Sequence, residues 1–216
     1  MSAPPRAVLF DFGGVFTTSP FAAFNRYEAA SGLPRDLIRR LNATNADANA
    51  WARLERSEIG VEEFCGLFEA EARVAGHVVD AHAVLACLAG ELQPEMVAAL
   101  ERVRGRFKTA CLTNNARVGD GPGMARAPEA AAEIARVMTL FDAVIESSKV
   151  GVRKPEPRFY EIACETLRVP PAEAVFLDDL GVNLKPARAM GMRTIKVRSS
   201  AQALRELESA LGLALR

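Results

Sequence analysis

Reactive side chains follow four short apolar segments of the sequence, and as a set they could carry out phosphoryl transfer. They comprise a carboxylate, a hydroxyl, a cation and an acidic pair, namely Asp11, Thr113, Lys154, and Asp178 with Asp179. Open parallel α/β sheets bind ligands beyond the carboxyl ends of their strands. We therefore expect these residues to meet at one edge of a sheet.

The chemistry that fits this set is attack of a carboxylate on phosphorus. Asp11 is the candidate nucleophile, and Mg²⁺ held by Asp11 and Asp179 would offset the repulsion between two anions. Thr113, the backbone after it and Lys154 would hold the phosphoryl oxygens, where negative charge lies in the transition state. Mg²⁺ binds few carboxylates and keeps several waters, which suits so sparse a set of ligands.

Each of these residues has a structural explanation when it is taken alone. Asp and Thr at strand ends commonly cap helices or form turns, and Asp-Asp pairs are common in solvated turns. Their occurrence at successive strand ends favours a site. Lys149 competes with Lys154 for the role of the cation, but Lys154 is favoured because Pro155 follows it and a helix is expected to begin there.

The elements that must position these residues follow from the apolar pattern. Buried parallel strands are predicted at residues 7–12, 109–113, 143–146, 174–178 and 193–197. Helices are predicted at residues 128–140, 157–167, 183–190 and 201–211. This alternation of strand and helix predicts an α/β fold with a doubly wound parallel sheet.

Residues 20 to about 90 interrupt the alternation, because they show no convincing strand and read as four or five helices. We predict that they form an inserted helical cap domain. The predicted boundaries are residues 17–94 for the cap domain and residues 1–16 and 95–216 for the α/β core domain. The glycine-rich residues 117–128 lack periodicity and are predicted to be a mobile loop.

Residues 144–157 and 176–188 resemble the motifs of the haloacid dehalogenase superfamily of hydrolases. In detail they are similar to the phosphatase-like amino-terminal domain of soluble epoxide hydrolase. The resemblance extends from Ala7 to about Leu211, and the helical insert corresponds to the family's cap. The strand-end motifs are specific as a set, whereas the motif around Asp11 alone would be weak.

The resemblance implies a role for each site residue. Asp11 would be the nucleophile and a metal ligand, Asp179 the second metal ligand, and Lys154 the cation that steadies nucleophile and phosphate. Thr113 and Asn114 would bind the phosphate. Asp178 and Asn183 would support the metal site without touching the ion.

Gly13 departs from the pattern of the family's phosphatases, which carry an Asp two residues after the nucleophile. That Asp protonates the leaving oxygen and later activates water, whereas Gly13 offers only its carbonyl oxygen, as a metal ligand. Metal binding is therefore better supported than efficient ester hydrolysis.

Three functions remain open for a sequence with this site and with glycine at position 13. The first is Mg²⁺-dependent, phosphatase-type hydrolysis of a small phosphorylated substrate through an aspartyl-phosphate on Asp11. The second is a pseudoenzyme or binding module that has lost its general acid. The third is a metal-independent, dehalogenase-type hydrolase.

The composition limits the classes of partner that this chain is expected to bind. The 216 residues contain 27 Lys and Arg against 27 Asp and Glu, so no long-range field attracts nucleic acid or anionic membranes. No apolar stretch approaches the ~18 to 20 residues that span a bilayer. We expect a cytoplasmic protein whose partner is a small phosphorylated molecule, with neither nucleic acid nor membrane as a partner. No feature of the sequence indicates an oligomeric state.

Overall fold

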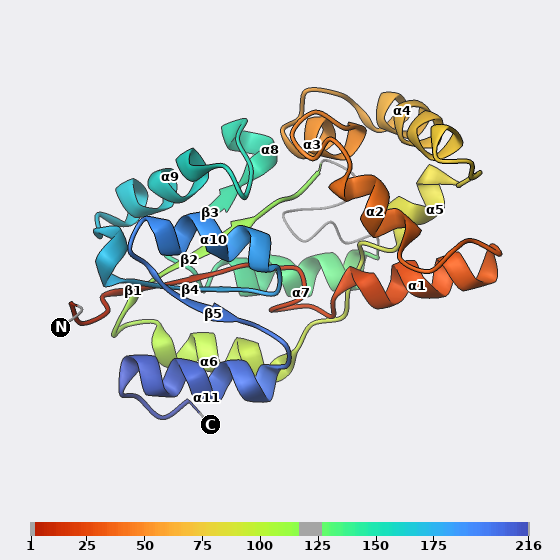
Figure 1. Cartoon of the computed structure of the whole chain (residues 1–216). Helices are drawn as coiled ribbons and strands as arrows, with labels where there is room; N and C mark the ends of the chain where they lie inside the picture. The colour runs from red at the N-terminus through yellow and green to blue at the C-terminus, as the bar shows by residue number, and fades with distance from the viewer. Residues whose placement is uncertain (1–2, 117–126, 216) are drawn as a thin grey trace.

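A computed structural model describes residues 3–116 and 127–215. Its centre is a sheet of five parallel strands in the order β3-β2-β1-β4-β5 (Figure 1). The strands are β1 (Ala7–Phe10), β2 (Lys108–Thr113), β3 (Ala143–Glu146), β4 (Ala174–Asp178) and β5 (Arg193–Lys196). The predicted α/β fold with a parallel sheet is confirmed. The predicted mobile loop lies almost wholly in residues 117–126, outside the described residues.

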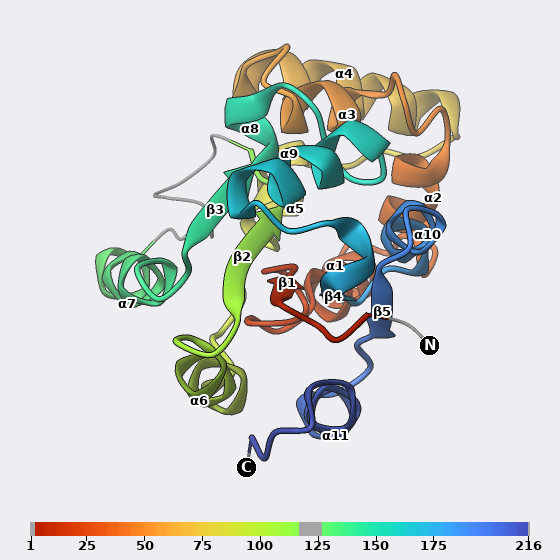
Figure 2. The same ribbon diagram turned by 90° about the vertical axis from the view of Figure 1, so that its left-hand side faces the viewer.

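Helices cover both faces of the sheet, which is why the central strands are apolar at consecutive positions. One face packs against α6 (Pro94–Val103), α7 (Pro128–Met138) and α11 (Ser200–Leu211). The other packs against α9 (Pro157–Leu167) and α10 (Gly181–Ala189). Figure 2 shows these two groups on opposite sides of the strands. In β1, Val8 and Phe10 belong to the first core, and Ala7 and Leu9 belong to the second.

Six helices separate β1 from β2, and the first five of them gather beyond one end of the sheet (Figure 1). These five are α1 (Pro20–Ala30), α2 (Leu37–Ala43), α3 (Ala50–Glu55), α4 (Val61–Val74) and α5 (Ala81–Ala86). Their apolar faces form a hydrophobic cluster of their own, in which Trp51 packs against Phe64 and Phe68 with ring centroids 5.4 and 5.7 Å apart. We call residues 17–94 the helical insert; its standing as a separate domain stays a prediction.

Several elements differ from the sequence-based expectation. The first strand ends at Phe10 rather than residue 12, because the carbonyl of Phe12 already accepts the N–H groups of a tight turn. Helix α6 was not predicted, although Met96, Val97 and Leu100 have helical spacing. Helix α10 begins at Gly181 and continues through Pro186.

The short helix α8 (Ser147–Val150) and the 3₁₀ helix η1 (Pro171–Glu173) complete the described elements. Among the described residues, no helix combines the length and the apolar character that crossing a membrane requires.

Candidate active site

The carboxyl ends of β1 and β4 bring three carboxylates together. The two strands are neighbours in parallel register, with Phe10 opposite Leu177, so the residues that follow in this register, Asp11 and Asp178, are side by side. Asp179 comes next in the chain. Each of the three carboxylates offers an oxygen within 4.8 Å of those of the other two. The sheet thus places the predicted acidic residues in one cluster.

Lys154 supplies the positive charge in this cluster. Its side chain is 1% exposed, and Nζ lies 2.7 Å from Asp11 Oδ1 and 2.9 Å from Asp178 Oδ2. Burial by itself lowers the pKa of Lys154, but the two carboxylates outweigh it and raise the pKa above its usual range. Lys149, the alternative, is exposed and pairs with Glu146 at 2.5 Å. Lys154 is therefore the cation of the cluster.

Asp11 is buried and held by one of its two carboxylate oxygens. Oδ1 accepts hydrogen bonds from the Phe12 N–H at 2.6 Å and from Lys154. Within the described part of the chain, Oδ2 accepts none. Burial is the main cause that raises the pKa of Asp11, followed by repulsion from Asp178, while Lys154 opposes the rise. The arrangement fixes the carboxylate while leaving one oxygen for chemistry.

Asp178 has hydrogen-bond donors on both oxygens. Oδ1 accepts from the Leu180 N–H at 2.7 Å, Oδ2 accepts from Lys154, and Asn183 Nδ2 lies 3.0 to 3.1 Å from both oxygens. Asn183 is fixed in turn, because Tyr160 donates its hydroxyl to the Asn183 carbonyl at 2.6 Å. These contacts orient Lys154 and are compatible with the supporting role implied for Asp178 and Asn183.

Asp179 is fixed by residues that follow β1. Ser19 Oγ donates to Asp179 Oδ2 at 3.3 Å. Gly14 has a φ of +76°, and a Cβ built on it would lie 2.4 Å from Asp179 Oδ2. Burial, followed by repulsion from Asp178, raises the pKa of Asp179 to about 6. Gly13 differs from Gly14, because its φ lies outside the left-handed region and a Cβ there would meet no atom within 4 Å.

Thr113 and Asn114 lie at the end of β2, beside β1. Thr113 is buried, and its hydroxyl makes no hydrogen bond to another described residue. The amide of Asn114 clamps the backbone of Lys154: Oδ1 accepts its N–H at 2.8 Å, and Nδ2 donates to its carbonyl at 2.9 Å. A phosphate contact from Asn114 would therefore come from its backbone N–H.

Two residues beside the site escaped the sequence-based reasoning. Ser19 contacts Asp179, and Glu55 contacts Asn114 at 3.1 Å. Both belong to the helical insert, far from the strand-end motifs in the sequence. No motif or spacing marks them, because their role depends on how the insert lies against the sheet.

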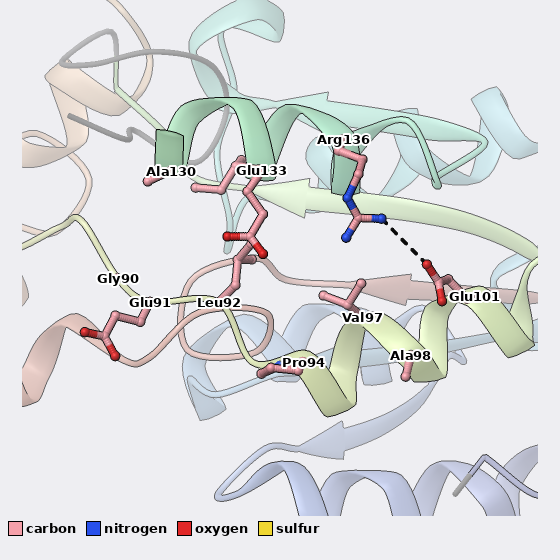
Figure 3. A pocket seen from close by; sticks show the side chains of 11 residues that line it. Gly90, Glu91, Leu92, Pro94, Val97, Ala98, Glu101, Ala130, Glu133 and Arg136 are labelled. Carbon is pink, nitrogen blue, oxygen red and sulfur yellow. Dashed lines mark ion pairs between the residues drawn. The ribbon is translucent and has the colours of Figure 1, made fainter. Parts of the chain in front are cut away.

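A hollow of about 520 Å³ lies elsewhere, between α6 and α7 (Figure 3). Apolar side chains such as Val97 line it together with Glu133 and an ion pair of Arg136 with Glu101 at 3.7 Å. None of the predicted site residues lines this hollow, so it is separate from the acidic cluster.

Comparisons with known proteins agree on one family. The model of haloacid dehalogenase-like hydrolases matches residues 5–191. Bifunctional epoxide hydrolase 2 of Mus musculus is 34% identical over 218 residues, which cover 96% of this chain and 39% of that protein. This chain thus spans about two fifths of that relative's length. Phosphatase MT3486 of Mycobacterium tuberculosis is 29% identical over 91% of this chain and 88% of its own.

A solved structure agrees in fold. A haloacid dehalogenase family enzyme of Bacteroides thetaiotaomicron, crystallised with magnesium and inorganic phosphate, superposes with a TM-score of 0.58 at 16% identity. The match covers 90% of this chain and 94% of that chain. The family resemblance seen in the motifs is confirmed by the family model, and the fold by this structure.

Proposed function

This chain belongs to the haloacid dehalogenase-like hydrolases, and from that premise we propose that it hydrolyses a small phosphorylated molecule with Asp11 as nucleophile and Mg²⁺ as cofactor. One observation carries the proposal. Buried Lys154 bridges Asp11 and Asp178 at the carboxyl ends of neighbouring strands, and Asp179 lies beside them.

The residues present fit a divalent cation. Three carboxylates face one ammonium group, which leaves two negative charges without a partner in the cluster. Mg²⁺ prefers oxygen ligands, and the three carboxylates of the cluster offer oxygen atoms. Asp11, Asp179 and the carbonyl of Gly13 would hold the ion, with Asp178 and Asn183 supporting them. When bound, the ion would neutralise charge on the phosphoryl oxygens.

The chain's own residues would carry the reaction in two steps. Asp11 attacks phosphorus, so that a new oxygen–phosphorus bond forms while the ester bond breaks and the leaving oxygen takes the electron pair. Lys154, the Thr113 hydroxyl and the Asn114 N–H donate to the phosphoryl oxygens. Water then attacks the aspartyl-phosphate, which releases inorganic phosphate and restores Asp11.

Relatives support this choice among the three functions. A relative that matches over most of both chains is named a phosphatase, and a structural neighbour holds magnesium together with inorganic phosphate. Asp179, which follows β4, has an obvious use as a metal ligand. A metal-independent dehalogenase would give it none, whereas Asp178 holds Lys154 in either case.

The decisive experiment is a screen of phosphorylated metabolites with and without Mg²⁺, using Asp11→Asn as the inactive control. We expect release of phosphate that requires both Mg²⁺ and Asp11. Halide release from haloacids without metal would instead favour a dehalogenase. Phosphate binding without turnover of any substrate would favour a binding module.

Metal binding is testable without any substrate. We expect calorimetric titration with Mg²⁺ to give a binding signal for the wild-type chain and to lose it in Asp179→Ala, because that variant lacks one of two carboxylate ligands. Glu63→Ala, which removes an exposed carboxylate of the insert, is the matched control. Equal binding by wild type and Asp179→Ala would remove Asp179 from the metal site.

A further inference from the structure

Glu55, the last residue of α3, reaches from the helical insert to the core beside the candidate active site. Its side chain is 12% exposed. Oε2 accepts hydrogen bonds from Arg153 Nε at 2.5 Å and from Asn114 Nδ2 at 3.1 Å. Oε1 accepts from Trp51 Nε1 at 3.1 Å. One oxygen is thus fixed by the core and the other by the insert.

The two core partners of Glu55 adjoin Lys154. Arg153 precedes it in the chain, and Asn114 clamps its backbone N–H and carbonyl. The two ends of an Asn amide are nearly equal in size, so hydrogen-bond partners decide which end points where. Glu55 only accepts, so its bond to Nδ2 reinforces the orientation that the Lys154 N–H and carbonyl also favour, with Nδ2 toward the insert and Oδ1 toward the Lys154 N–H.

The role of Glu55 is more than that of a simple ion pair joining the insert to the core. Arg153 Nη1 also donates to the carbonyl of Ala46 at 2.9 Å, so Arg153 is tied to the insert without Glu55. What Glu55 adds is the bond to Asn114. From there the chain of contacts runs through Lys154 to Asp11, 2.7 Å from the ammonium group.

We propose that Glu55 is a positioning residue for Lys154: it fixes the amide of Asn114 from the insert, and so holds the Lys154 ammonium group against Asp11. Its effect on turnover rests on the proposed function. The effect of Glu55 on the Lys154 backbone is independent of the proposed function, because it follows from the hydrogen bonds alone.

Glu55→Gln tests the idea with minimal change in size. Gln has one acceptor oxygen, so either Trp51 or the pair of Asn114 and Arg153 must face an NH₂ group. Glu63→Gln is the control, because Glu63 is 56% exposed and pairs only with Arg53 of the insert in the described contacts. Both variants are made in the full chain.

The first readout is hydrogen exchange of the Lys154 backbone amide, followed by NMR without substrate. We expect Glu55→Gln to accelerate it by roughly 10-fold or more, the scale of one hydrogen bond to a charged group, and Glu63→Gln to leave it unchanged. An unchanged Lys154 amide in Glu55→Gln overturns the proposal, whatever happens to the melting temperature.

The second readout is kinetic. We expect Glu55→Gln to lower kcat by about 10- to 100-fold with little change in KM, because supporting contacts of a reactive group act mainly on the transition state. Adding Glu55→Gln to Asn114→Ala should cost little more, since both act through one contact. Full additivity would argue against Asn114 as the route. If the wild type hydrolyses no phosphate ester, the proposed function fails, and the amide exchange still decides the role of Glu55.

Discussion

Gly13 and Gly14 follow Asp11, the proposed nucleophile, and they differ in whether the structure requires glycine. Gly14 adopts a left-handed conformation and touches the carboxylate of Asp179, so any side chain would be both strained and obstructed. Gly13 has neither constraint, because open space surrounds the position of its missing Cβ. Nothing in the backbone therefore requires glycine at position 13. Its effect is chemical: the site lacks a side-chain proton donor there.

The absence of an acid at Gly13 predicts a steep dependence on the leaving group. The departing oxygen must carry most of its negative charge, so aryl and acyl phosphates should react far better than alkyl phosphates. General acid catalysis is typically worth ~10² to 10⁴ in rate, and Gly13→Asp should recover alkyl phosphate hydrolysis while changing aryl hydrolysis little. The measurement is kcat/KM for both substrates in both proteins. Equal rates in the wild type would mean that another group donates the proton.

Substitution of Gly14 should weaken metal binding although Gly14 is not itself a proposed metal ligand. Gly14→Ala would place a Cβ 2.4 Å from Asp179 Oδ2, so we expect Asp179 to be displaced and Mg²⁺ affinity to fall by about 10-fold or more, as for other supporting contacts of metal ligands. Gly13→Ala is the matched control and should bind Mg²⁺ as the wild type does. Calorimetry compares the two. The interpretation is wrong if Gly14→Ala retains full affinity.

At the scale of elements, the two connections of the helical insert are joined to each other. The Thr18 N–H donates to the Glu91 carbonyl, and the Gln93 N–H donates to the Phe16 carbonyl, each at 2.8 Å. Thr17 and Leu92 form an antiparallel bridge between them. The insert therefore leaves and re-enters the core through one hydrogen-bonded pair of segments, which would bend together.

Gly90 adjoins this pair of segments, and its substitution tests how tightly they pack. A Cβ at Gly90 would lie 2.7 Å from the Thr18 carbonyl oxygen and 2.9 Å from Thr17. We expect Gly90→Ala to lower the free energy of unfolding by about 1 to 3 kcal/mol, the usual range for overpacking.

Gly66→Ala is the control for Gly90→Ala, because it lies within α4 with open space around it. It should raise stability by roughly 0.5 to 1 kcal/mol, the usual helical gain of Ala over Gly. Denaturant unfolding measures both variants. If Gly90→Ala and Gly66→Ala change the free energy of unfolding equally, the connecting segments accommodate the added methyl group without overpacking.

At the scale of the whole molecule, apolar packing separates the insert from the sheet. Two hydrophobic cores lie on the two faces of the sheet, and a third lies among the helices of the insert and includes only Ala116 from the segment after β2. Polar contacts join insert to core near the site, including Ser57 Oγ to the Ser148 carbonyl at 3.0 Å and Arg56 to Glu156 at 3.6 Å. Polar contacts can exchange with water at modest cost, so relative motion of the two parts is expected.

This separation predicts that the insert shields the site during turnover. Exclusion of water strengthens the electrostatic interactions around a reacting phosphate, so a bound phosphate mimic should slow hydrogen exchange in the insert. The slowing should concentrate in α3 and at its contacts with the core. The slowing is measured by hydrogen exchange with and without Mg²⁺ and vanadate. The same measurement on Asp11→Asn shows how much of it is independent of the Asp11 carboxylate. Unchanged protection of α3 would indicate a fixed lid.

The sequence by itself determined most elements of the core, though not α6, and most of the chemical set. Four of the five predicted strands agree with the structure to within one residue, because strands of a parallel sheet covered on both faces appear in the sequence as short, largely apolar runs. Asp11, Lys154, Asp178 and Asp179 were found from strand ends, since parallel strands deliver their carboxyl ends to one edge. The sequence favoured Lys154 over Lys149 because Pro155 follows it, and the structure places Lys154 against Asp11 and Asp178.

Only the tertiary structure decided how these groups are held. It buried Lys154 between Asp11 and Asp178, turned the side chain of Asn114 onto the Lys154 backbone, and brought Glu55 from the insert to that amide. The contacts of Asn114 with Lys154 and with Glu55 join residues 40 and 59 positions apart. Local sequence specifies propensity and periodicity, whereas hydrogen bonds between distant residues depend on how the insert lies against the sheet, which no short-range pattern encodes.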